Sequence, residues 1–167
     1  MIGNVLLTTM RLRRRQYTVL GNSEGEKIMK NTMEEKSLLE QARDSYTSTM
    51  EDIDKLWTAY QSGEEEVEDL GTFNEYGLSF DYVAAGTFID QDQGFFRYQI
   101  SWGGPSEEFR YYTDAELNAY KVEFWYLDWN CGQKVHPTAS DEKILLEIWD
   151  FFKDCGSIES ELAKATE

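Results

Sequence analysis

The sequence is poor in the residues on which disulfide frameworks, metal sites and many active sites are built. Its 167 residues include one histidine, two cysteines and two prolines. Two cysteines are too few for a disulfide framework and favour a reducing compartment, so we expect a cytoplasmic protein. Every apolar run is shorter than the roughly 18 residues of a membrane span, so we expect no membrane association.

Motifs of catalysis and metal binding are equally scarce. His136 precedes Pro137 in an expected loop, and the chain has no G-x-S-x-G turn. Asp128, Cys131 and His136 match no zinc pattern, so we interpret them as an ordinary surface loop with a packed cysteine. "SWGGPSEEF" at 101–109 lacks the lysine of a phosphate-binding loop and is typical of a hairpin turn. The sequence therefore predicts no catalytic residue, no metal and no cofactor.

Basic residues are half as numerous as acidic ones. Sixteen lysines and arginines stand against 32 aspartates and glutamates, which gives a formal net charge of −16. Small soluble domains typically carry a net charge of about 2–8 in magnitude. A chain this acidic repels nucleic acid and anionic membranes and attracts basic proteins. We therefore expect a basic protein surface as the partner, with no direct nucleic-acid binding.

The first 28 residues differ from the rest in charge and pattern. They carry five bases and two acids, and a short apolar run precedes the arginines. A secretory signal has the opposite order, with charge first. One back-translation of "EGEKIM", residues 24–29, contains a bacterial ribosome-binding sequence just before the Met29 codon. Two interpretations stay open: a leader that is not part of the native protein, or a basic disordered tail. We place a single acidic domain at 29–158 and a frayed tail at 159–167.

A long amphipathic helix is predicted over residues 33–62. "TMEE" is a capping-box pattern with Thr32 as N-cap, and Gly63 is a suitable stop. Apolar residues recur at three- and four-residue steps between these ends, at Leu38, Ala42, Tyr46, Met50, Ile53, Trp57 and Tyr60. This stripe favours packing against the domain's own sheet over a coiled-coil partner, because it is too short for sustained heptads.

Four antiparallel strands are predicted in the middle of the chain. Residues 78–83, 95–102, 107–112 and 119–129 alternate apolar and polar side chains, as expected for a sheet with one buried face. Leu78, Phe80, Tyr82, Phe96, Tyr98, Ile100, Trp102, Phe109, Tyr111, Val122, Phe124 and Tyr126 form the inward set. The outward set includes Asp81, Arg97, Glu108, Arg110 and Glu123, which we expect to form cross-strand ion pairs.

A second helix follows, with Ser140 as N-cap and Gly156 as its stop. The predicted fold is therefore α+β: a long N-terminal helix, a four-stranded antiparallel β-meander and a C-terminal helix, arranged in two layers.

The acidic residues are the main indication of function. Residues 29–76 carry thirteen acids and four bases, and the run "GEEEVEDL" at 63–70 holds five carboxylates in six positions. Carboxylates fixed on a folded scaffold can occupy the basic cleft that a phosphate backbone would occupy, and an exposed tryptophan such as Trp125 or Trp129 can add a strong contact. The predicted partner-binding residues are Glu51, Asp52, Asp54, Glu64, Glu65, Glu66, Glu68, Asp69, Asp90, Asp92, Glu107, Glu108 and Trp125.

In size, charge, aromatic content and lack of a catalytic signature, the chain resembles the small acidic DNA-mimic proteins of phages and plasmids, which include antirestriction and anti-CRISPR proteins. The residues that carry the resemblance are the acids of helix 33–62 and of "GEEEVEDL". The resemblance implies a non-enzymatic inhibitor that blocks the nucleic-acid channel of a bacterial defence complex.

Three alternatives stay beside this interpretation. An immunity- or antitoxin-type protein would neutralise one basic toxin through a local acidic patch. A small hydrolase is the third functional class, because carboxylates are so numerous that no pair can be singled out or dismissed. The remaining alternative is a soluble domain whose acids have no binding role, because runs of acidic residues usually lie on solvent-exposed faces. A homodimer is compatible with each of them.

Overall fold

The structure is a computed structural model that describes residues 37–64 and 66–165. The elements in chain order are α1 (Leu38–Ser62), α2 (Phe73–Tyr76), β1 (Ser79–Val83), β2 (Phe95–Ser101), β3 (Ser106–Thr113), β4 (Ala119–Asp128), β5 (Cys131–Val135), α3 (Ala139–Asp154) and α4 (Ser157–Ala165). The expected leader, the domain start at Met29 and the N-cap Thr32 lie outside the described residues. In the described part of the chain, no helix combines the length and the apolarity that crossing a membrane requires.

The α+β class is confirmed, but the sheet has five strands where four were predicted. All neighbours pair antiparallel, and the strand order is β1-β2-β3-β4-β5. The additional strand is β5, whose sequence "CGQKV" lacks the alternation that marks the other four. It pairs with the end of β4, where Asp128 lies opposite Cys131. The strand conformation of β5 therefore follows from its pairing with β4 and not from the side-chain pattern of β5.

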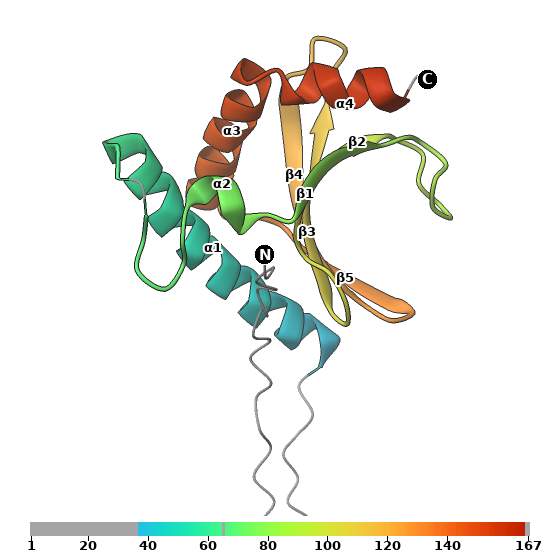
Figure 1. The fold of residues 1–167 in the computed structure, drawn as a ribbon. Coiled ribbons are helices and arrows are strands. Elements are labelled where there is room, and N and C mark those ends of the chain that lie inside the picture. The colour runs from blue at the N-terminus through green and yellow to red at the C-terminus, as the bar shows by residue number, and fades with distance from the viewer. Residues whose placement is uncertain (1–36, 65, 166–167) are drawn as a thin grey trace, which may run out of the picture. The chain divides into compact units, whose positions relative to one another are not determined.

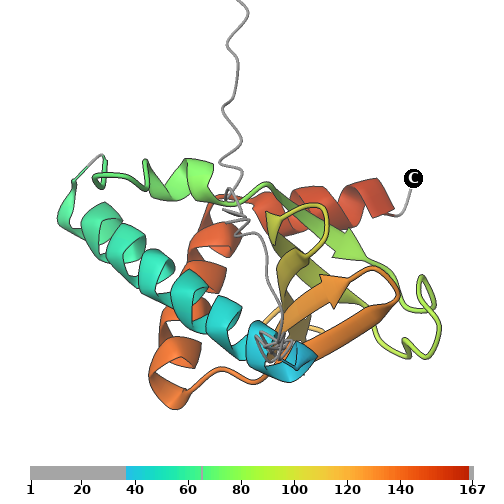
Figure 2. The same cartoon turned by 90° about the horizontal axis from the view of Figure 1, so that it is seen from below.

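The long helices pack on one face of the sheet, which we call the inner face (Figures 1 and 2). The buried core joins Tyr46 and Ile53 of α1, Trp149 of α3 and Ile158 of α4 to the apolar side chains of the strands. Most of the predicted inward set lies in or against this core. Leu78 and Trp102 were wrongly assigned to it. Both lie just outside the strands and are 61% and 76% exposed. Beyond the last paired residue of a strand, side chains no longer alternate between the two faces of the sheet, so the alternating pattern does not predict burial there.

Helix α1 begins later than its predicted first residue. Its N-cap is Ser37, whose hydroxyl accepts from the backbone N–H of Glu40, while the Glu40 carboxylate accepts from the backbone N–H of Ser37. This is a capping box, formed by "SLLE". The predicted stop is confirmed: Gly63 adopts a left-handed φ of 81° and caps the helix. The predicted stripe is buried from Ala42 to Trp57, while Leu38 is half-buried and Tyr60 is exposed.

The C-terminal region holds two helices where one helix and a frayed tail were predicted. Thr138, and not Ser140, is the N-cap of α3, and its hydroxyl accepts from the backbone N–H of Asp141. Gly156, with a φ of 73°, turns the chain into α4. Helix α4 then continues to Ala165 because Ile158 is fully buried against the core. One buried isoleucine in a polar segment is a weak signal for a docked helix.

Replacing Tyr111 by phenylalanine is expected to raise the free energy of unfolding by about 1 kcal/mol. The Tyr111 hydroxyl is buried and, among the described residues, has no hydrogen-bond partner. A buried polar group without a partner costs about 1–3 kcal/mol. Urea denaturation measures the change. Tyr98→Phe is the matched control, since the Tyr98 hydroxyl is hydrogen-bonded to the Gly77 backbone. A Tyr111→Phe protein less stable than the wild type would contradict the prediction.

Candidate functional site

The structure distributes the predicted partner-binding residues over five places. Helix α1 carries Glu51, Asp52 and Asp54; the α1–α2 loop carries Glu64, Glu66, Glu68 and Asp69; the β1–β2 loop carries Asp90 and Asp92; β3 carries Glu107 and Glu108; and β4 carries Trp125. Glu65 lies outside the described residues. We call residues 63–70 the acidic loop.

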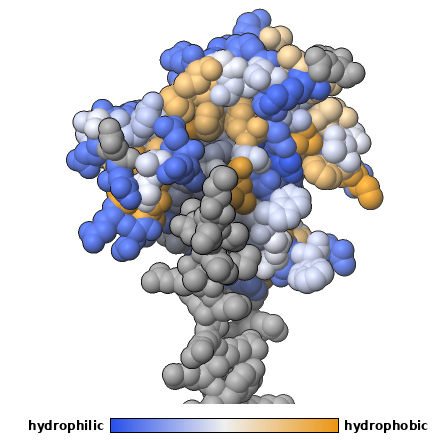
Figure 3. Space-filling view, in the orientation of Figure 1, coloured by the Kyte–Doolittle hydropathy of each residue, from blue (hydrophilic) through white to orange (hydrophobic). Residues whose placement is uncertain are grey.

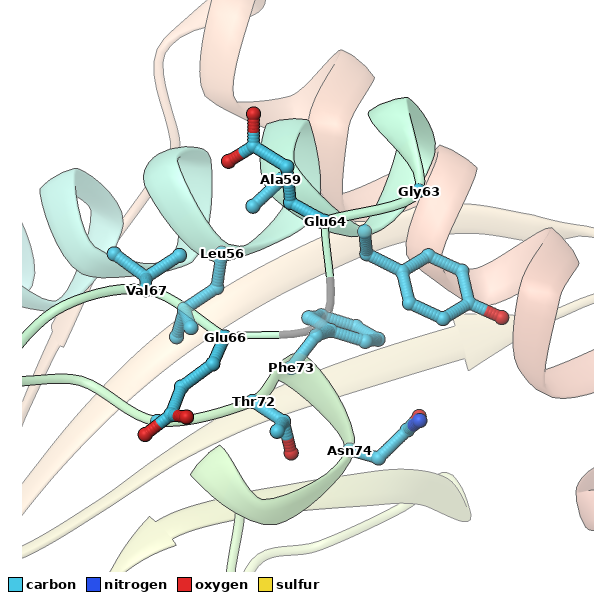
Figure 4. A pocket seen from close by; sticks show the side chains of 11 residues that line it. Leu56, Ala59, Gly63, Glu64, Glu66, Val67, Thr72, Phe73 and Asn74 are labelled. Carbon is cyan, nitrogen blue, oxygen red and sulfur yellow. The ribbon is translucent and has the colours of Figure 1, made fainter.

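The acidic loop folds back beside the end of α1. After the Gly63 cap the chain reverses, and Val67 forms a bridge with Gly71. Asp69 adopts a left-handed φ of 67° inside this turn, a conformation that aspartate tolerates better than most residues. The reversal leaves a pocket of about 410 Å³, lined by apolar side chains of α1, the acidic loop and α2. Leu56, Val67 and Phe73 surround the pocket, with Glu64 and Glu66 on either side (Figure 4).

Most carboxylates of α1 and the acidic loop face solvent without a counterion. Within the described residues, no ion pair involves Glu51 or Asp54, and the same holds for the described acids of the acidic loop. All of them are exposed. Asp52 differs, because it lies 3.9 Å from the Lys55 ammonium and accepts from the Tyr76 hydroxyl at 3.4 Å. We call six of these exposed acids, which have no ion pair among the described residues, the acidic surface: Glu51, Asp54, Glu64, Glu66, Glu68 and Asp69.

The two acids of β3 point to opposite faces of the sheet, and neither forms part of the acidic surface. Glu107 lies on the inner face and accepts from the Ser45 hydroxyl of α1. Glu108 lies on the other face, which we call the outer face, and its side chain is only 2% exposed. Assigning Glu108 to a partner-binding surface was therefore wrong. Strand alternation separates adjacent residues, so a pair of neighbouring glutamates cannot act as one acidic patch.

Buried charges on the outer face form an ion-pair cluster around Glu108. Arg110 donates from Nε to the Glu108 carboxylate at 2.6 Å, and Arg97 lies 3.8 Å from the same carboxylate. Arg97 also donates two hydrogen bonds to Asp81, at 2.9 and 2.6 Å. The Arg110 guanidinium lies over the Trp125 ring at 4.0 Å. The prediction of cross-strand ion pairs on this face is confirmed by Arg97 and Asp81.

A second buried carboxylate, Glu123, organises the neighbouring part of the outer face. It accepts from Lys134 at 3.0 Å, from the Trp125 indole at 3.1 Å and from the Tyr112 hydroxyl at 3.2 Å. Lys121 lies 3.6 Å away. Burial alone would raise the pKa of Glu123, but these hydrogen bonds and the two ammonium charges outweigh burial, and the pKa is lowered. Trp125 is thus half-buried and held in place, and was wrongly predicted to be exposed.

Acid is expected to destabilise the fold in part through Glu123. A carboxylate whose pKa is lowered in the folded state stabilises the fold at a pH above its unfolded pKa, about 4.3, and this contribution is lost as the pH falls through the folded pKa. Glu123→Gln should therefore reduce stability at pH 7 and flatten the loss of stability below pH 4. Melting temperatures measured from pH 7 to pH 3 check this. Glu64→Gln, which neutralises an exposed acid, is the control; a slope unchanged by Glu123→Gln would contradict the assignment.

Arg110, Glu123 and Lys134 were not among the predicted site residues. Alternation in the sequence placed Arg110 and Glu123 on the outer face, but it gave no sign that they would be buried there. Lys134 belongs to the strand that was not predicted. In the described ranges, no three His, Cys, Asp or Glu side chains gather in a way that could hold a metal ion. Comparisons with family models, with curated proteins and with solved structures give no match.

Proposed function

We infer that the chain is a non-enzymatic inhibitor that binds a basic, nucleic-acid-binding surface in a bacterial defence complex of the restriction or CRISPR kind. One observation carries the proposal: the acidic surface of α1 and the acidic loop consists of exposed carboxylates that have no counterion among the described residues. A protein gains nothing in stability by keeping such like charges together, because they repel one another. A basic partner would relieve that repulsion.

The spacing of the charges supports the proposal. At 1.5 Å of rise per residue, Glu51 and Asp54 lie about 4.5 Å apart along the α1 axis. The acidic loop adds further carboxylates beside the C-terminal end of the helix, and this end of the molecule is mostly hydrophilic (Figure 3). Duplex DNA presents one charge per roughly 1.7 Å of axis, so a cleft built for DNA offers several lysines and arginines over this length.

A second candidate is favoured by the pocket beneath the acidic loop. An immunity-type protein, which neutralises one basic toxin, needs a local patch with a strong central contact. The pocket of about 410 Å³ between α1 and α2 is apolar and has carboxylates on either side. A partner side chain with a long apolar stem and a cationic end would fit both features.

Charge reversals on the acidic surface distinguish these candidates. For an inhibitor that mimics DNA, Glu64→Lys, Glu66→Lys and Glu68→Lys should each weaken binding about two- to five-fold, and their effects should multiply, because many weak ionic contacts share the affinity. For a local interface, Tyr60→Ala, which removes a wall of the pocket, should abolish binding by itself. Partner proteins are first captured from bacterial lysate on the immobilised full chain. The affinity of each variant for a captured partner is then measured by titration.

The controls test the assignment of the surface and of the partner. Glu159→Lys makes the same charge change on an exposed residue of α4. A loss of affinity equal to that of Glu66→Lys would mean that net charge, and not this surface, governs binding. The captured partner should also be released by excess duplex DNA. Release by salt alone, with no effect of DNA, would contradict a shared nucleic-acid site.

A further inference from the structure

A large groove runs along the outer face of the sheet, away from the helices. Its volume is about 1160 Å³, and its floor includes Arg110 and Trp125. One wall is the β1–β2 loop at residues 87–93, and the opposite wall is the end of β4 with β5. In Figure 1 these walls are the loop at the right and the β4–β5 hairpin below it. We call it the outer groove.

Apolar side chains project from both walls of the outer groove. Ile89 is 94% exposed on the loop wall, and Trp129 is 93% exposed on the opposite wall. Phe88, beside Ile89, is also exposed. Apolar atoms at the tip of the β1–β2 loop are visible at the right edge of Figure 3. Large apolar side chains gathered around a concave surface are typical of a protein interaction site.

The two walls carry charges of opposite sign. Asp90 and Asp92 lie on the loop wall, Lys134 lies on the strand wall, and Lys121 lies in the groove at the start of β4. The two lysines share the single carboxylate of Glu123, so the side of the groove formed by β4 and β5 keeps a positive charge. No ion pair among the described residues joins the two walls. The outer groove therefore combines projecting apolar side chains with a concave floor, and it has an acidic side and a basic side.

We propose that a second copy of this chain occupies the outer groove, as a twofold-symmetric dimer. A twofold interface requires one surface that is complementary to itself. Rotation by 180° can set the acidic loop wall of one copy against the basic strand wall of the other. The same rotation brings Ile89 and Trp129 of each copy to the hollow of its partner. A purely acidic or purely basic partner would match only one wall.

The charge of the chain gives the dimer a distinctive salt dependence. Two copies with a net charge of −16 repel each other at long range, and salt screens this repulsion. Salt also screens the attraction between the acidic and basic walls, but these are few charges compared with the net charge of −16 on each copy, and the apolar contacts in the outer groove are not weakened by salt. Dimerisation should therefore strengthen as the salt concentration rises from low to physiological. Binding of a basic partner at the acidic surface should weaken over the same range, so the two interactions can be told apart.

Sedimentation equilibrium of the full chain, from low to high micromolar concentration, tests the proposal. We expect a monomer–dimer equilibrium whose association constant rises with salt. Ile89→Ser and Trp129→Ser should each weaken the dimer at least about tenfold, as for central contacts of an interface. Leu78→Ser is the matched control, because Leu78 is exposed outside the outer groove. Both residues of the groove are almost fully exposed, so circular dichroism should show unchanged folds.

The two cysteines provide a second measurement. Cys131 lines the outer groove, and Cys155 is exposed at the end of α3. At a concentration that favours the dimer, alkylation by iodoacetamide should slow at Cys131 and not at Cys155, and Ile89→Ser should remove this protection. A monomer at every concentration, or a dimer that Leu78→Ser disrupts and Ile89→Ser does not, would overturn the proposal. Neither result would affect the inhibitor function proposed for the acidic surface.

Discussion

Replacing Trp149 by alanine is expected to lower the free energy of unfolding by about 4 kcal/mol, within the range for removing a buried tryptophan. The Trp149 side chain is 1% exposed, and its ring lies 5.1 Å from that of Phe96 and 5.3 Å from that of Tyr111. Its indole N–H also donates to the Leu117 carbonyl at 3.1 Å. The substitution would open a cavity where α3 meets the sheet and would free the β3–β4 turn. Denaturation with urea measures the loss.

Trp149→Phe separates the two contributions. Phenylalanine keeps most of the apolar contact but cannot donate to Leu117, so we expect a smaller loss, of about 1–2 kcal/mol. Lys153 holds the same turn through the Glu116 carbonyl and the Asn118 side chain, and it limits the effect of losing one hydrogen bond. A Trp149→Ala protein that loses less than about 1 kcal/mol would show that α3 is not a central part of the core.

Replacing Arg110 by alanine is expected to cost about 3 kcal/mol, because it leaves the buried Glu108 carboxylate without its closest counterion. Removing one partner of a buried ion pair typically costs 3–5 kcal/mol. We expect the lower end of that range, since Arg97 remains 3.8 Å from Glu108. The loss of the contacts between Arg110 and the rings of Phe95 and Trp125 adds to the cost.

A neutral pair provides the decisive comparison for Arg110. Glu108→Gln combined with Arg110→Met removes both charges and keeps similar volumes, so it should recover most of the stability that Arg110→Ala loses. Lys121→Met, which removes a more exposed base beside Glu123, should cost less than about 1 kcal/mol. An Arg110→Ala protein as stable as the double variant would mean that the buried Glu108 charge needs no counterion.

The parts of the fold that were predictable are those that a local pattern determines. The stripe of α1 and the alternation of four strands each recur over many residues, so tertiary contacts did not change them. Strand β5 was not predictable, because "CGQKV" is held by its pairing with β4 and its glycine and lysine hide the pattern. Helix α4 was missed for a similar reason, since among its described residues only Ile158 is fully buried, and Leu162 packs against the core while partly exposed.

The candidate sites show the same division. The concentration of acids in the acidic loop is a property of composition, and it could be predicted from the sequence. The burial of Glu108 and Glu123 on the outer face could not, because it depends on how Arg97, Arg110 and Trp125 from three strands pack together. The outer groove depends on the β1–β2 loop lying opposite β5, two segments that have no common pattern in the sequence.

The strand order also governs how the chain folds as it leaves the ribosome. Every strand pairs with its neighbour in sequence, so the sheet can form as a series of hairpins, each complete soon after it is made. Helix α1 packs against the nearby α2, where the Trp57 and Phe73 rings lie 4.9 Å apart, but its contact with α3 joins Trp57 to Glu147, made 90 residues later. At a synthesis rate of about 5–20 residues per second, α3 is made roughly 5–18 seconds after this part of α1. During that interval the carboxylates on the polar side of α1 keep nascent chains apart.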